Sequence, residues 1–418
     1  MTALLESLHA AFVDLAPSKP ALDQAIAIGL PGPRSEQWKY TSLRALSARR
    51  FAAPSKTLAT LNAESQTSIA AIPAPRIVFV NGVFDPGNSV LSDLPDGLSV
   101  RSDAIANADD DLRFAGAHEI FAKLNAAIAR QGMQVHLANR VAAPVRLHVV
   151  FVSLSVGQDL AIPYRHKIVL AENAKLDLIE HHISQDAQQH LSNHLCDISL
   201  QQGAELTHAR IQQDDNGSSQ FLRTEAALQD NAVYRRLDLE LGAHLSRHDL
   251  QVQLLGDGAS VHANGSLIAN GRRHIDTRLD IRHIAQNTAC NLLWRGLATE
   301  RGRAVFHGGI LIDKGADGAA AHLSNKNLLL SDNAEIDTQP VLVIHADEVT
   351  ASHGATVGRL EAGHLFYLRA RGIPEAQAKA MLTNAFCKET LQVLANNELI
   401  DLVAPSLEKA LQAIEVQA

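Results

Sequence analysis

The chain has few cysteines and few aromatic residues, and each shortage argues against a class of protein. Its three cysteines, Cys196, Cys290 and Cys387, stand far apart in 418 residues, and no two of them form a CxxC pair. This spacing favours reduced, buried thiols in a cytosolic protein over a disulfide framework. Aromatic residues make up only 4% of the chain, and a β-propeller usually carries stronger aromatic signatures in its blades.

Excess positive charge and long apolar runs are also lacking. The formal net charge is -8, and the adjacent pair Arg272-Arg273 is too small to form a basic patch, so no nucleic-acid partner is expected. No run of about 18 apolar residues occurs, which argues against a membrane-spanning helix. Residues 1–15 are typical of an amphipathic helix and carry no signal-peptide pattern. A cytoplasmic protein without a membrane partner is predicted.

Common catalytic motifs are missing as well. The sequence contains no GxxxxGK[ST] phosphate loop, no HExxH zinc helix and no GxSxG elbow. The run Gly256-Asp257-Gly258 lacks the third glycine of a dinucleotide-binding fingerprint. No catalytic residue is therefore predicted, and the chain is not expected to be an enzyme.

The patterns that are present divide the chain into four regions. Residues 1–75 have helical apolar spacing, as in Leu4, Leu5, Leu8 and Phe12, and residues 76–145 mix strand and helix patterns. Residues 146–360 contain short strands rich in Val, Ile and Leu, and residues 361–418 return to helical spacing. A mainly β protein with helical regions at both ends is predicted.

A turn tripeptide recurs within the strand region. It begins at Asn173, Gly203, Asn231 and Gly258, in steps of 30, 28 and 27 residues, and returns at Gly315 and Asn333. Such a period indicates a solenoid or a propeller, and Asn and Gly suit left-handed corners. A right-handed parallel β-helix (β-solenoid) is the natural candidate, because the aromatic content is low for a propeller.

Two further segments carry a resemblance to a known family. One spans residues 322–373 and includes Leu328 to Ile336, Ala351 to Gly358 and Leu365 to Ile373, and the other runs from Glu36 through Trp38-Lys39-Tyr40-Thr41. The chain resembles the SufB/SufD family, scaffold proteins of bacterial iron-sulfur cluster assembly, over nearly its whole length. The resemblance implies the same parallel β-helix. No cysteine lies between His322 and Gly358, which fits the SufD role.

The resemblance also implies partners. A SufD-type chain would pair with SufB through the β-helix and with the SufC ATPase through its C-terminal helical region, as a non-catalytic scaffold that builds and transfers nascent clusters. No permanently bound cofactor is implied, only a transient iron-sulfur cluster or iron at the SufB–SufD interface. Whether the isolated chain forms a homodimer stays open.

Particular residues follow from the matching positions. His353, in Ser352-His353-Gly354-Ala355-Thr356, matches the segment in which the family supplies a histidine at the SufB contact. An imidazole there could ligate iron transiently or relay a proton. Phe366, Tyr367, Arg369 and Arg371 match the part that docks SufC, with an internal cap over the solenoid end as the alternative.

For the other candidate residues, we expect structural roles. Most of the 20 histidines are expected on the surface or in ladders along one face of the solenoid. Cys290 and Cys387 are expected to be buried, and Ala351 stands where some relatives have a cysteine. Two other functions stay open: a carbohydrate-active β-helix enzyme, and a solenoid that binds an unrelated partner.

Overall fold

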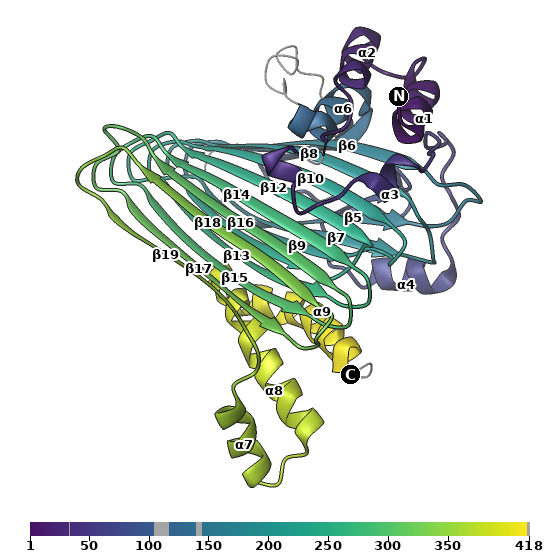
Figure 1. The fold of residues 1–418 in the computed structure, drawn as a ribbon. Helices are drawn as coiled ribbons and strands as arrows, with labels where there is room; N and C mark the ends of the chain where they lie inside the picture. The colour runs from purple at the N-terminus through teal and green to yellow at the C-terminus, as the bar shows by residue number, and fades with distance from the viewer. Residues whose placement is uncertain (33, 104–116, 139–143, 416–418) are drawn as a thin grey trace.

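Two long β-sheets form the body of the protein in the computed structural model, which describes residues 1–32, 34–103, 117–138 and 144–415 (Figure 1). The ten-stranded sheet has the order β19-β17-β15-β13-β11-β9-β7-β5-β1-β2 and the nine-stranded sheet the order β18-β16-β14-β12-β10-β8-β6-β4-β3. The first sheet comprises β1 (Arg76–Val80), β2 (Val83–Phe84), β5 (Val145–Ser153), β7 (Lys175–Ser184), β9 (Glu205–Gln213), β11 (Val233–Glu240), β13 (Ser260–Ala269), β15 (Ala289–Ala298), β17 (Ala320–Leu329) and β19 (Thr350–Gly358). The second comprises β3 (Leu98–Asp103), β4 (Gln131–Leu137), β6 (Ala161–Leu170), β8 (Leu191–Leu200), β10 (Ser219–Leu228), β12 (Leu245–Leu254), β14 (His274–His283), β16 (Arg303–Ile312) and β18 (Glu335–Ile344).

From β4 onward, consecutive strands alternate between the two sheets, so each of these strands up to β17 pairs with the strand two places later. The pairs β7–β9 and β10–β12, for example, are parallel and in register along their length. The predicted parallel β-helix with helical regions at both ends is confirmed. The strands β1 and β4 already belong to the two sheets, and the division of the chain at residues 75, 145 and 360 stays a prediction.

The repeated tripeptide lies in the corner that leads from each even-numbered strand to the following odd-numbered strand, for example from β6 to β7. Asn173, Gly203, Asn231 and Gly258 have φ of 57°, 64°, 55° and 71°, a left-handed conformation that Asn and Gly adopt most readily. Each one donates its N–H to a carbonyl of the next coil. Asn side chains lie against the glycines of the next coil, so a Cβ at Gly203 or Gly258 would collide with Asn173 or Asn231.

The two later members of the predicted series do not join this ladder: Gly315 has the predicted left-handed conformation, with φ of 87°, but does not stack, and the prediction at Asn333 is wrong. The ladder continues through Asn287 and Gly318 rather than Gly315, because the corner between β16 and β17 is longer and shifts the stacked position. Asn333 precedes β18 in the opposite corner and is not among the residues with positive φ.

Helices cover the outer faces of the sheets (Figure 1). Those near the N-terminus, except α4, pack on the nine-stranded sheet through a cluster that includes Leu4, Trp38, Phe121, Phe221 and Leu245. Ile69 of α4 packs instead on β1 and β5 of the ten-stranded sheet. Those near the C-terminus pack on the ten-stranded sheet. The helices are α1 (Ala3–Phe12), α2 (Lys19–Ile28), η1 (Glu36–Trp38), α3 (Arg44–Ser47), α4 (Ala63–Ala70), η2 (Ala117–Glu119), α6 (Ile120–Ile128), α7 (Ala362–Ala370), α8 (Glu375–Lys388), η3 (Glu389–Leu394) and α9 (Asn397–Glu415).

The interior between the sheets has an apolar and a polar half. Beside the Asn/Gly corner, strands begin or end with buried apolar residues such as Leu176, Leu206, Val261 and Leu200. Toward the opposite corner the interior side chains of β7, β9 and β11 are charged, imidazole or amide groups. Among the described helices, none has the length and apolar character that crossing a membrane requires.

Candidate functional site

The solenoid ends at β18 and β19, and His353 lies on the last strand. Among the described strands, β18 pairs only with β16 and β19 only with β17, so one edge of each sheet has no neighbour. His353 is exposed and stands in register with Leu323, an interior residue of β17. Because side chains alternate along a strand, His353 shares the inner face of β19 with Ala351, which packs against the solenoid core.

Apolar side chains surround this open end. Val343, Ile344 and Val357, on β18 and β19, are between 41% and 42% exposed. Exposed apolar residues beside unpaired strand edges are typical of a surface that another protein covers. The structure therefore brings the predicted His353 together with an uncovered apolar edge that the sequence pattern did not single out.

The predicted docking residues lie elsewhere, on a hairpin that projects from the body (Figure 1). Phe366 and Tyr367 on α7 are 75% and 58% exposed. The guanidinium of Arg371 lies 5.2 Å from the Tyr367 ring centroid, and Arg369 forms an ion pair with Glu375 of α8 at 3.4 Å. None of the α7 residues is buried, so these side chains do not cap the solenoid in the described chain.

The cysteines are placed as predicted. Cys196, Cys290 and Cys387 are free and buried. Burial raises the pKa of Cys290 and of Cys387 to about 12, which keeps both as thiols at neutral pH and removes the nucleophilic thiolate form.

A buried polar network fills the second half of the interior, and the sequence pattern did not predict it. Arg236 donates to both carboxylate oxygens of Asp238, at 2.7 to 3.1 Å. It also donates to Nδ1 of His208 at 2.7 Å, and Nε2 of His208 lies 3.0 Å from Glu180. These residues are at most 4% exposed, so Arg236 and Asp238 compensate each other's charge inside the solenoid.

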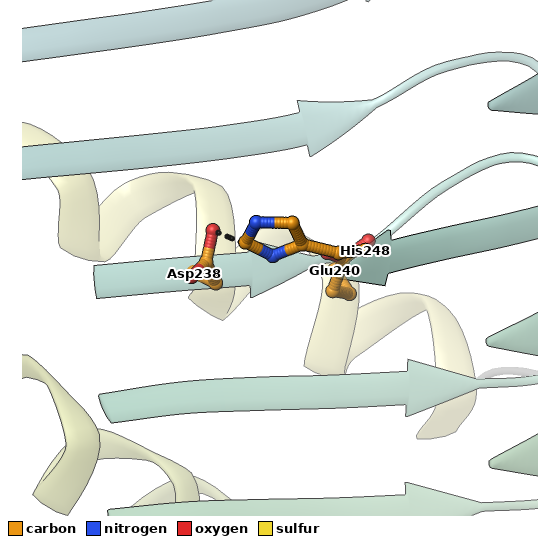
Figure 2. A group of neighbouring side chains, drawn as sticks. All are labelled: Asp238, Glu240 and His248. Atoms are coloured by element: carbon orange, nitrogen blue, oxygen red, sulfur yellow. Dashed lines mark ion pairs between the residues drawn. The ribbon is translucent and has the colours of Figure 1, made fainter. Parts of the chain in front are cut away.

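One group in this network has the composition of a metal site. Asp238 and Glu240 of β11 and His248 of β12 each place one ligand atom within 4.8 Å of the others (Figure 2). We call these three residues the triad. Nδ1 of His248 lies 3.6 Å from Oδ1 of Asp238 and has no hydrogen-bond partner. Carboxylate oxygens and an imidazole nitrogen together suit several divalent metals.

The arginines beside the triad argue against a bound cation. Arg236 holds Asp238, and Arg210 donates to Oε1 of Glu240 at 2.8 Å while Ser246 donates to Oε2 at 2.8 Å. A divalent ion would have to displace these donors and would add positive charge beside two buried guanidinium groups. The arrangement fits a charge-compensated core better than a metal site.

The pKa shifts agree with this interpretation. Burial opposes ionisation of Asp238, but the charge of Arg236 and the hydrogen bonds from its guanidinium lower the pKa of that carboxyl. Burial lowers the pKa of His248 to about 3, so its ring is neutral at physiological pH. Burial also raises the pKa of Glu240 against the influence of Arg210.

Several of the histidines form the predicted ladder, but inside the solenoid. Nε2 of His166 lies 3.2 Å from Nδ1 of His194 on the neighbouring strand, and Nδ1 of His166 accepts from the N–H of Met133. Burial lowers the pKa of His166 to about 4. These rings therefore act as neutral hydrogen-bonding groups between coils.

Comparison with known proteins supports one family. Residues 153–386 match the model for "SUF system FeS cluster assembly, SufBD core domain". The Iron-sulfur cluster assembly SufBD family protein slr0076 of Synechocystis is 31% identical over 386 residues, covering 89% of this chain and 85% of that protein.

Two further relatives agree. The Iron-sulfur cluster assembly protein SufD of Escherichia coli K12 is 30% identical over 381 residues, covering 90% of this chain and 88% of that protein. Protein ABCI7, chloroplastic, of Arabidopsis thaliana is 25% identical over 318 residues, covering 74% and 66%. The solenoid, its terminal helices and these matches together show that the chain belongs to the SufBD family of SUF system iron-sulfur cluster assembly proteins.

Proposed function

We propose that this chain is the SufD-type scaffold of its assembly system, without catalytic activity of its own. In this proposal the open end of the solenoid pairs with a SufB partner and the α7–α8 hairpin docks a SufC ATPase. The main support is the open end itself, where β18 and β19 have free edges and exposed Val343, Ile344 and Val357. A second solenoid could extend both sheets there through main-chain hydrogen bonds.

His353 would face the contact between the two solenoids. It is exposed on the inner face of β19, and among the described residues no hydrogen bond or ion pair holds its ring. A free imidazole at this position can bind iron transiently or accept a proton as sulfide arrives. Iron and the nascent cluster are then cargo at the seam rather than a resident cofactor.

The projecting hairpin would transmit motion from the ATPase. Phe366 and Tyr367 are exposed aromatic side chains on a helix that contacts the rest of the chain mainly through α8. Exposed aromatic residues flanked by arginines are typical anchors of protein interfaces. Nucleotide-driven movement of the hairpin would then open the seam that contains His353.

Co-purification tests the two interfaces. A tagged chain is expected to retain both SufB and SufC, and Phe366→Ala is expected to weaken SufC retention while SufB stays bound. Val156→Ala is the matched control, because Val156 is also exposed, at 43%, but lies far from the hairpin in sequence. Equal SufC recovery with both variants would refute docking through Phe366.

A second experiment tests the role of His353. In cells that depend on this system alone, His353→Ala is expected to abolish cluster maturation while the complex still forms. His345→Ala is the control, because His345 is exposed in the neighbouring corner between β18 and β19. Normal maturation with His353→Ala would refute the role.

Other expectations stay predictions. The cytoplasmic location and a homodimer of the isolated chain can be measured by fractionation and by light scattering. Membership of the SufBD family removes the main reason to consider a carbohydrate-active enzyme, and no arrangement in the described chain favours it.

A further inference from the structure

The apolar pattern of β19 sets its register only weakly. Its inner face carries Ala351, His353, Ala355 and Val357, and its outer face carries only Thr, Ser and Gly residues. Small and polar side chains on both faces specify register weakly. A slip of one residue would turn His353 to the other face of the sheet, because side chains alternate with a period of two.

Two buried polar side chains and one partly buried hydroxyl form a network next to this strand. Asn325 and Asn327 are the inner residues of β17 that follow Leu323, and Thr338 lies on β18. Nδ2 of Asn327 donates to Oδ1 of Asn325 at 2.6 Å and to the carbonyl of Thr356 on β19 at 3.0 Å. Oγ1 of Thr338 donates to Oδ1 of Asn325 at 2.7 Å. The network thus joins β17, β18 and β19.

Apolar residues could fill these positions at lower cost. Asn325 and Asn327 are 0% and 2% exposed, and burying amides costs free energy unless every partner is present. Neighbouring interior positions of the same coils are apolar, including Leu323 and Phe306. Gly296 leaves room for the Asn327 amide, since a Cβ at that position would collide with Oδ1.

We propose that Asn325, Asn327 and Thr338 form a clamp that holds β19 in one register and so positions His353 at the open end. The hydrogen bond to the Thr356 carbonyl is specific to one register, because a one-residue slip would place an N–H or a different carbonyl opposite the amide. This inference rests on the proposed function of His353 for its biological consequence, whereas the clamp itself can be measured without it.

Hydrogen exchange of the full-length chain tests the clamp. Asn327→Leu has a similar shape but cannot bond to Thr356, and amide exchange in residues 350–358 is expected to accelerate roughly tenfold. The matched control is Asn264→Leu, which removes a buried amide that donates to the carbonyl of Thr390 on the opposite face of the sheet. That control is expected to leave residues 350–358 unchanged.

A thiol probe reports the register. Ala351→Cys places a thiol against the core, whereas the three native cysteines are already buried. Its alkylation is expected to become faster when Asn327→Leu is added. If Asn327→Leu does not fold, Thr338→Val removes the link to β18 with little change in volume and is expected to give the same effect in a weaker form.

The outcomes separate the clamp from the proposed function. Unchanged exchange and unchanged alkylation in the clamp variants would overturn the clamp. Faster exchange, together with normal cluster maturation in both Asn327→Leu and His353→Ala, would leave the clamp standing and refute the role of His353. Faster exchange with reduced maturation in both variants supports the whole proposal.

Discussion

Acidification is expected to destabilise this protein through its buried imidazoles. His166 and His248 are fully buried, His181 is partly buried, and the three lie on different strands. Burial lowers the pKa of His166 to about 4 and the pKa of His181 and His248 to about 3. In the unfolded chain each imidazole regains a pKa of about 6.5.

The direction of the pH dependence follows from whether the folded or the unfolded chain binds more protons. Below about pH 6.5 the unfolded chain takes up protons that the folded chain cannot, so the free energy of unfolding falls as the pH falls. From about pH 7.5 to about pH 5.5, each imidazole lowers the free energy of unfolding by about 1.4 kcal/mol, and the three together lower it by about 4 kcal/mol. The whole free energy of unfolding of a folded domain is only about 5–15 kcal/mol.

Other groups change the size of this effect but not its direction. Burial also lowers the pKa of His148, His274 and His283 to about 4, which adds to the loss of stability on acidification. Burial raises the pKa of Asp177, Asp280 and Glu240, and these carboxyl groups offset part of it because they take up protons in the folded state.

Urea unfolding followed by circular dichroism at several pH values measures the effect. The decisive quantity is the slope of unfolding free energy against pH, which His248→Gln is expected to reduce by about half a proton on average between about pH 7.5 and about pH 5.5. His136→Gln serves as the control, because His136 is exposed. Equal unfolding free energies at about pH 7.5 and about pH 5.5 would refute the reasoning.

Three further predictions concern the interior. Arg236→Met leaves the Asp238 carboxylate buried without its partner and should cost about 3–5 kcal/mol of unfolding free energy; Arg236→Met with Asp238→Leu should recover much of that loss, and no recovery would contradict the pairing. Gly265→Ala should cost about 1–3 kcal/mol because its Cβ would collide with Trp294, whereas Gly354→Ala meets nothing within 4 Å and should leave the urea midpoint unchanged. Added Zn²⁺ or Mn²⁺ should not raise the melting temperature, because guanidinium groups already hold the triad carboxylates; a saturable rise would show that the triad binds metal.

Local chemistry allowed much of the fold to be predicted. Left-handed corners need Asn or Gly, so the positions of Asn173, Gly203, Asn231 and Gly258 indicated the coil length directly. The prediction failed at Asn333, and Gly315 adopts a left-handed conformation without joining the ladder, because a single tripeptide encodes neither the corner length nor the corner to which it belongs. The exposed position of His353 agrees with its predicted role, which only the experiments above can test.

The sequence alone indicated a repeating β architecture, because corner residues and short apolar strands are local signals that repeat at the coil period, and the low aromatic content favoured a solenoid over a propeller. Only the tertiary structure decided which face of each strand is interior. In β11, Leu237 and Leu239 alternate with Arg236, Asp238 and Glu240, which suggests an apolar interior face and a charged outer face. The leucines instead pack beneath α9 and η3, and the charges lie inside. Both faces are covered by segments distant in sequence, and complementary charges from neighbouring coils compensate the interior, so the alternation could not identify the inside.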